Sequence, residues 1–146
     1  MRVFKIPGKP QAKQRPRFNV ENGRVYTPKE TSSYENYVKM CYLDYASTLN
    51  WEKLDGALRA EIEVFITPPV SDSKKKKAMK LSHAIRPAVK PDIDNITKSI
   101  LDALNGVAYV DDKQVVECEV KKFYGEEASV YAVSYTHLTL PTTPYV

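Results

Sequence analysis

Two aspartates, Asp92 and Asp94, stand directly before a segment with a helical pattern, and this arrangement constrains the fold more than any other feature of the chain. In an extended backbone, residues two apart project to the same face, so the two carboxylates are expected to lie close together. Two unit charges about 4 Å apart interact by roughly 4 kcal/mol at an effective dielectric constant of about 20. The pair therefore predicts a compensating cation or a shared proton.

Mg²⁺, or Mn²⁺ in its place, is the simplest such cation, because hard divalent ions prefer carboxylate and water oxygens. Two-metal sites of this kind carry out in-line displacement at phosphate. The alternative is a helix cap, the usual role of an aspartate before a helix. Asp94 stands at the expected N-cap position, so this alternative applies in part.

Residues 95–104 are predicted to form an amphipathic helix closed by Asn105 and Gly106. At about 100° per residue, apolar side chains fall on one arc and a polar stripe lies opposite. The arc comprises Ile96, Ile100, Ala103 and Leu104, with Leu101 at its edge, and the stripe comprises Asp94, Lys98 and Asp102. Lys98, one turn beyond Asp94, is a candidate to stabilise charge at a phosphate. A surface ion pair is the alternative for this lysine.

A second acidic pair, Asp111 and Asp112, follows the short apolar segment 107–110. A helix of about twelve residues is about 18 Å long, so these carboxylates approach Asp92 only if the chain runs back along the helix. Spacing alone does not establish that return.

Strands are predicted where apolar and polar residues alternate. They cover residues 2–6, 58–67, 114–124 and 128–133, with a hairpin turn at 125–127. In the second, Ala60, Ile62, Val64 and Ile66 share a face, and in the third Val116, Cys118 and Val120 do so.

Two further helices are expected, over residues 27–49 and 71–81, the latter capped by Ser71 or Asp72. The first carries a stripe of Tyr34, Tyr37, Val38, Cys41, Tyr42 and Tyr45, which favours core packing over base stacking. The predicted class is therefore α+β: one domain with a mixed sheet of four to five strands and two main helices.

Residues 86–125, RPAVKPDIDNITKSILDALNGVAYVDDKQVVECEVKKFYG, resemble the signature region of the RusA family of Holliday junction resolvases, especially its prophage-borne branch. N-terminal motifs resemble the same branch: Gly8-Lys9-Pro10, Lys13-Gln14-Arg15-Pro16-Arg17-Phe18 and Tyr26-Thr27-Pro28. The resemblance implies a RusA-like fold and a homodimeric, magnesium-dependent endonuclease that nicks four-way DNA junctions symmetrically. It also implies catalytic roles for Asp92, Asp94, Lys98 and Asp112. The three aspartates would bind the metal, with Asp111 as a further candidate.

Basic residues on either side of this region are candidate DNA contacts, and the resemblance favours phosphate binding over a merely solvated surface. They are Lys13, Arg15 and Arg17 in a proline-containing loop, the run Lys74, Lys75, Lys76 and Lys77, and Arg86. His83 is expected to be structural. A net charge of +4 and a pI of about 8.9 suit a polyanionic partner.

The first ten residues lack the apolar run of a signal peptide, and no segment has the length of a membrane span. We therefore expect a cytoplasmic protein with no membrane partner, in which Cys41 and Cys118 are buried and reduced.

Residues 133–142, VSYTHLTLPT, resemble the translation of a sequencing adapter. We expect residues 1–132 to form the domain and residues 133–146 to be an artificial or non-native tail, with a natural polar tail as the alternative. His137 is thus a poor catalytic candidate.

Three functions are consistent with the sequence: a junction resolvase acting in DNA recombination and repair, a less selective nuclease for branched DNA, and a junction-binding protein without catalytic activity. The intact acidic set and Lys98 disfavour the third.

Overall fold

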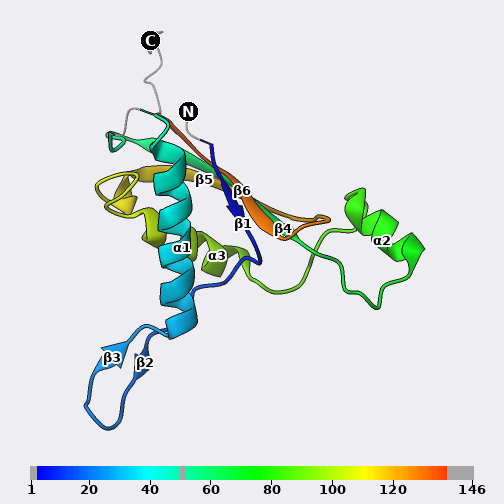
Figure 1. Cartoon of the computed structure of the whole chain (residues 1–146), viewed down its shortest axis with the longest axis horizontal. Coiled ribbons are helices and arrows are strands. Elements are labelled where there is room, and N and C mark those ends of the chain that lie inside the picture. The colour runs from blue at the N-terminus through cyan, green and yellow to red at the C-terminus, as the bar shows by residue number, and fades with distance from the viewer. Residues whose placement is uncertain (1–2, 50–51, 138–146) are drawn as a thin grey trace, which may run out of the picture.

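Four strands form a mixed sheet in the order β1-β6-β4-β5 (Figure 1). The computed structural model describes residues 3–49 and 52–137. The strands are β1 (Lys5–Pro7), β4 (Leu58–Ile66), β5 (Val115–Tyr124) and β6 (Ser129–His137). β4 pairs in parallel with β5 and antiparallel with β6, and β1 pairs antiparallel with β6. The α+β class and the mixed sheet are therefore as predicted.

The turn after β5 is not a hairpin, which corrects the prediction for residues 125–127. β4 lies between β5 and β6, so these consecutive strands are not hydrogen-bonded neighbours. The chain crosses the end of β4 at Gly125, whose N–H donates to the carbonyl of Ile66 at 3.0 Å. A Cβ at Gly125 would lie 3.1 Å from Cδ1 of Phe65, so glycine permits this close crossing.

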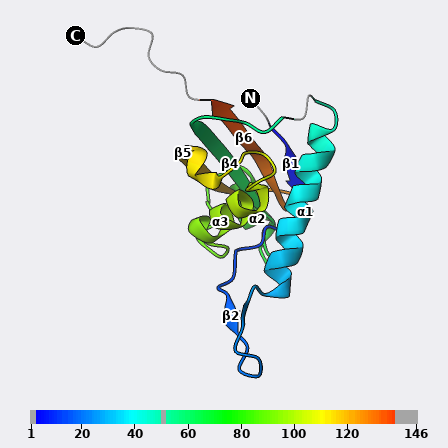
Figure 2. The same cartoon turned by 90° about the vertical axis from the view of Figure 1, so that its left-hand side faces the viewer.

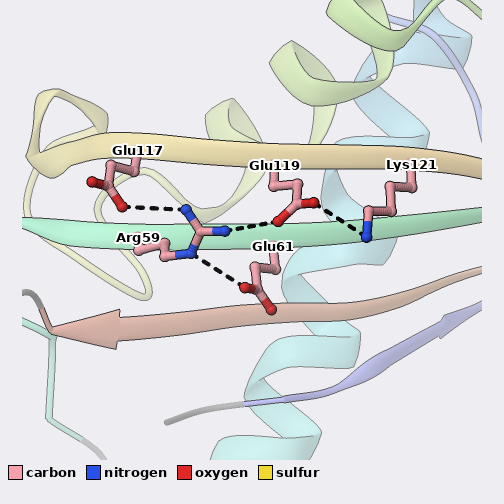
Figure 3. Close-up of polar contacts among 5 residues, drawn as sticks. All are labelled: Arg59, Glu61, Glu117, Glu119 and Lys121. Atoms are coloured by element: carbon pink, nitrogen blue, oxygen red, sulfur yellow. Dashed lines mark hydrogen bonds and ion pairs between the residues drawn. The ribbon is translucent and has the colours of Figure 1, made fainter.

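Alternation in β4 is as predicted: Leu58, Ala60, Ile62 and Val64 are buried. The opposite face of β4 and β5 carries charged side chains (Figure 3). The prediction for β5 is partly wrong. A register shift places Leu58 opposite Val115 but Arg59 opposite Glu117, so Val116 falls on a bulge and is exposed. Val115 and Val120 pack against the core instead.

The cysteine prediction also fails in part. Cys118 on β5 is exposed, and Cys41 is half-buried. β5 is an edge strand, with β4 on one side only, so the side chain of Cys118 is covered less than one on a central strand.

Two helices, α1 (Lys29–Ala46) and α3 (Ile93–Leu104), lie on one side of the sheet (Figures 1 and 2). α1 buries Thr31, Tyr34, Val38, Tyr42 and Ala46, which confirms core packing for most of the tyrosine stripe, while Tyr37 is exposed. α3 buries Ile96, Ser99, Ile100, Ala103 and Leu104, the arc that the sequence predicts. These residues and those of β4 form one hydrophobic core.

The short helix α2 (Lys74–Leu81) stands to one side of the sheet (Figure 1). Its N-cap is Ser73, whose hydroxyl accepts from the N–H of Lys76, and neither predicted cap, Ser71 nor Asp72, serves. Asp72 instead pairs with Lys80 at 2.5 Å, and the Lys80 ammonium lies 4.8 Å from the centre of the Tyr124 ring. The contact of the Lys80 ammonium with the Tyr124 ring ties α2 to the end of β5.

Two smaller elements complete the fold. β2 (Arg17–Phe18) and β3 (Val25–Tyr26) form a separate antiparallel hairpin that projects from the body below α1 (Figures 1 and 2). A single 3₁₀ turn, η1 (Asp112–Gln114), precedes β5.

β6 extends to His137, four residues past the predicted end of that strand. Residues 138–146 of the predicted tail lie outside the described residues, and its non-native origin stays a prediction. None of the described helices combines the length and the apolar character needed to cross a membrane.

Candidate active site

Asp92 and Asp94 line a pocket of about 830 Å³ between the first turn of α3 and the basic loop before β2. We call it the carboxylate pocket. Its lining comprises Lys13, Gln14, Arg15, Pro16, Arg17, Asp92, Asp94, Asn95 and Lys98. Backbone hydrogen bonding joins the two walls, because the N–H of Lys13 donates to the carbonyl of Asn95 at 3.1 Å.

The start of α3 differs from the prediction. The N-cap residue is Asp92, not Asp94, and its side chain makes no capping hydrogen bond. Asp94 lies in the first helical turn, so the extended-backbone reason for its proximity to Asp92 does not hold. Both side chains are exposed and line one pocket, and the helix N-terminus favours negative charge there.

Lys98 lies one turn beyond Asp94 and lines the same pocket, as its spacing predicts. Asp92, Asp94 and Lys98 are thus brought together by the structure. Their catalytic roles stay predictions.

Asp112 does not line this pocket. After α3 the chain runs back only a short way, since the hydroxyl of Tyr109 donates to the carbonyl of Leu101 at 2.7 Å. Asp112 therefore comes beside Asp102, which lies about 12 Å along the helix axis from Asp94. The expected convergence of Asp92, Asp94 and Asp112 is absent here.

Within residues 3–49 and 52–137, no group of three or more His, Cys, Asp or Glu side chains is placed to hold a metal ion. The role of Asp112 as a catalytic metal ligand therefore stays a prediction, because the structure holds Asp112 apart from Asp92 and Asp94.

Carboxylates crowd one another at this second acidic group. Burial, a hydrogen bond with Asp111 and the nearby charge of Asp102 raise the pKa of Asp112. The backbone N–H of Lys113 donates to Asp111 and holds the pKa of that carboxyl below its usual value. Carboxylates crowded in this way repel one another, and a nearby positive charge would relieve that repulsion.

Asp111 has a structural role that the sequence prediction missed. Its carboxylate and the Gln114 side chain form a capping box around η1. This cap serves η1, whereas the N-cap position of α3, expected at Asp94, belongs to Asp92.

Lys13 separates the two acidic groups. Its ammonium lies 2.5 Å from Oδ2 of Asp102 and 3.2 Å from Oε1 of Glu35, while the residue lines the carboxylate pocket. Burial lowers the pKa of Lys13, but hydrogen bonds with Asp102 and Glu35 outweigh it and leave that pKa raised. Lys13 is therefore held by protein carboxylates, and its predicted contact with DNA would require it to leave them.

Asp102, the partner of Lys13, is not among the predicted site residues. The signal was present, because Asp94, Lys98 and Asp102 recur every four residues on one stripe of α3.

The other candidate DNA contacts fall into three settings. Arg15 and Arg17 are exposed at the carboxylate pocket. Lys74, Lys75, Lys76 and Lys77 lie on α2, away from that pocket. Arg86 is occupied, because its Nε donates to the carbonyl of Lys122 at 2.8 Å and its guanidinium lies 4.0 Å from the centre of the Phe123 ring. His83 packs edge-on against the same ring, which agrees with a structural role.

The donors of the carboxylate pocket fit a hard divalent ion. Mg²⁺ in proteins keeps several waters and takes only one or two carboxylates together with substrate phosphates. Asp92 and Asp94 provide two such carboxylates, and Arg15 and Arg17 stand where a phosphate would also be favoured.

Two comparisons with known proteins cover most of this chain. The family described as Endodeoxyribonuclease RusA matches residues 7–133. The uncharacterized protein YqaN of Bacillus subtilis (strain 168) is 39% identical over 132 residues, which cover 87% of this chain and 90% of YqaN. The matched region contains both walls of the carboxylate pocket and the Asp111-Asp112 pair, so this chain belongs to the RusA family of endodeoxyribonucleases.

Proposed function

We propose that this protein is a structure-specific, Mg²⁺-dependent endodeoxyribonuclease that resolves Holliday junctions by paired symmetric nicks in DNA recombination and repair. The observation that carries the proposal is the carboxylate pocket, where Asp92, Asp94 and Lys98 face two exposed arginines in a chain of a DNA endonuclease family. Membership in the prophage-borne branch stays a prediction.

In this proposal the arginines, the lysine and the aspartates of the carboxylate pocket have separate roles. Arg15 and Arg17 hold the phosphates on either side of the cleaved bond. Lys98 places a positive charge beside the scissile phosphate, where it stabilises the departing 3′ oxygen or the attacking water. Asp92 and Asp94 hold the divalent ion, which supplies an activated water and neutralises charge on the phosphate oxygens when bound.

Asp112 is the third predicted ligand, and its participation requires that the second acidic group move toward the pocket. Lys13 stands between the two groups through its ion pair with Asp102. Release of Lys13 to a DNA phosphate would free Asp102 and remove this obstacle. Lys13, a predicted DNA contact, would then also control whether Asp112 reaches the carboxylate pocket.

Paired nicks need two copies of the site. A four-way junction has two-fold symmetry, and a C2 homodimer would present two carboxylate pockets in a fixed relation. We therefore propose a homodimer with four-way junction DNA as its partner.

A second candidate is a protein that binds junctions without cutting them. It is favoured by one observation, the separation of Asp112 from Asp92 and Asp94 among the described residues. A less selective nuclease for branched DNA is the remaining alternative.

One experiment separates these functions. The protein is incubated with a synthetic mobile four-way junction, a three-way junction and a linear duplex, each with and without Mg²⁺. The proposal expects nicks at symmetry-related positions of the four-way junction only, and only with Mg²⁺. Similar rates on all branched substrates would indicate the less selective nuclease. Tight junction binding without nicks would refute catalysis.

A further inference from the structure

The β2–β3 hairpin carries apolar side chains that the described part of the chain does not cover. The exposed fractions are 61% for Phe18, 86% for Val20, 68% for Val25 and 46% for Tyr26. The hairpin pairs only with itself and stands clear of the main sheet (Figures 1 and 2). Contiguous exposed apolar side chains of this kind mark a surface that meets a partner.

The tip of the hairpin is held by its own hydrogen bonds. The N–H groups of Asn19 and Gly23 donate to the carbonyls of Arg24 and Asn19, both at 2.8 Å. Side-chain oxygens of Asn19 and Asn22 accept from the N–H groups of Glu21 and Arg24, both at 2.9 Å. Gly23 has a φ of +68°, which glycine adopts without strain. The exposed side chains are therefore presented on a defined frame.

The register assigns these side chains to two faces. Phe18 lies opposite Val25, and Arg17 lies opposite Tyr26. Because directly opposite residues share a face, Phe18 and Val25 form an apolar pair on one side of the ribbon. Arg17, on the other side, lines the carboxylate pocket. The apolar pair is thus joined to the candidate active site through a two-residue strand.

Charge indicates which partner this surface meets. Arg15, Arg17 and Arg24 lie within the hairpin or next to it in the sequence, against the single carboxylate of Glu21. A two-fold contact between copies would place two such positive hairpins together, whereas a DNA backbone complements them. A hairpin of this size also offers far less than the ~800 Å² per partner of a standard protein interface.

We propose that Phe18 and Val25 act as a wedge that enters the branch point of DNA and stacks on a base exposed there. This inference rests on the proposed function, since a branch point exposes base faces that a continuous duplex covers. Aromatic side chains stack on any base, so the wedge would read the shape of the branch without reading its sequence. The arginines around it hold the adjoining phosphates and direct the strand to the carboxylate pocket.

The test uses a four-way junction with 2-aminopurine at the branch point, in EDTA so that cleavage does not intervene. Wild-type protein is expected to raise the fluorescence as the base leaves its stack. In Phe18→Ala the rise is lost and the Kd for the junction increases about 5- to 100-fold, with little change for linear duplex. Phe18→Leu keeps an apolar contact with Val25 but cannot stack, so it is expected to behave like Phe18→Ala.

Two controls make the outcome decisive. Phe18→Trp preserves stacking and is expected to retain the wild-type Kd for the junction. Val70→Ala removes an even more exposed apolar side chain, with an exposed fraction of 92%, from a different loop and is expected to change nothing. A full fluorescence rise with Phe18→Ala would overturn the wedge.

Sedimentation of the same variants tests whether the apolar pair instead contacts a second copy of this chain. If Phe18→Ala converts a dimer to a monomer, the apolar pair is a subunit contact and the wedge is wrong. Nicking by wild-type protein with Mg²⁺ is scored separately. A wild-type chain that nicks junctions without perturbing 2-aminopurine overturns the wedge alone, whereas one that perturbs it without nicking overturns the nuclease alone.

Discussion

Arginines on two surfaces of this molecule have opposite surroundings: one is paired with carboxylates, and the others are not. On the outer face of the sheet, Arg59 reaches three carboxylates, those of Glu61 and Glu117 at 3.2 Å and that of Glu119 at 2.7 Å (Figure 3). Hydrogen bonds with Glu117 and Glu61 raise its pKa. At the carboxylate pocket, Arg15 and Arg17 are exposed and make no ion pair within the described residues.

This difference indicates which surface meets DNA. On the strands β1, β4 and β5 the outer face carries Glu61, Glu63, Glu117 and Glu119 together with Lys5, Arg59 and Lys121, so carboxylates outnumber basic side chains there and disfavour phosphates. Free arginines at the pocket need break no internal ion pair before they bind a phosphate. The net charge of +4 is thus unevenly distributed between the outer face of the sheet, where carboxylates are in excess, and the pocket, where basic side chains are in excess.

The largest expected effect is at the pocket carboxylates. Asp94→Asn should lower single-turnover cleavage of a four-way junction about 1000-fold or more, because it removes a charged ligand of the divalent ion. Junction binding should be kept or strengthened, since a negative charge is removed. Glu63→Gln on the outer face is the matched control and should cleave normally. Cleavage by Asp94→Asn within about tenfold of wild type would reject the assignment.

Lys98→Met comes next. It keeps the length of the side chain but removes the charge beside the scissile phosphate, so we expect a loss of about 100-fold in the cleavage rate with little change in junction Kd. Lys121→Met, from the outer face, serves as the control in the same assay. An unchanged rate would assign Lys98 to a surface ion pair.

A smaller effect is expected at the free arginines. Arg15→Ala and Arg17→Ala should each weaken binding of all DNA substrates and lower the slope of log K against log salt by about 1. Measurement is by titration of a labelled junction at several salt concentrations. Arg59→Ala should leave that slope unchanged. Equal slopes for all three variants would erase the contrast between the two surfaces.

The smallest effect is the stability cost of the paired arginine. Arg59→Ala should lower the free energy of unfolding only slightly, because its ion pairs are accessible to solvent. Urea denaturation checks this value, and 1 M salt should reduce the difference further. A large loss of stability would mean that the charged face is covered in solution.

Much of the fold could be predicted because its signals are local. The arc of Ile96, Ile100 and Leu104 and the alternation of Ala60, Ile62 and Val64 follow from helix and strand periodicity, and both are buried as expected. The proximity of Asp94 and Lys98 follows from one helical turn.

What could not be predicted depends on contacts between distant segments. The insertion of β4 between β5 and β6, and the bulge at Val116, are set by pairing with residues more than fifty positions away. The position of Asp112 depends on how far the chain returns along α3, which Tyr109 limits by its bond to Leu101. Spacing in the sequence carries no information on that distance.

The pairing of β1 with β6 joins the beginning of the described chain to its end, and this has a consequence for synthesis. On the ribosome, β1 emerges early but waits for β6, since no other described strand flanks it. The loop that bears Lys13, Arg15 and Arg17 follows β1 directly and is anchored by it. A nascent chain therefore completes its carboxylate pocket late, and an alteration of β6 is expected to affect the position of the arginines near the other end of the described chain.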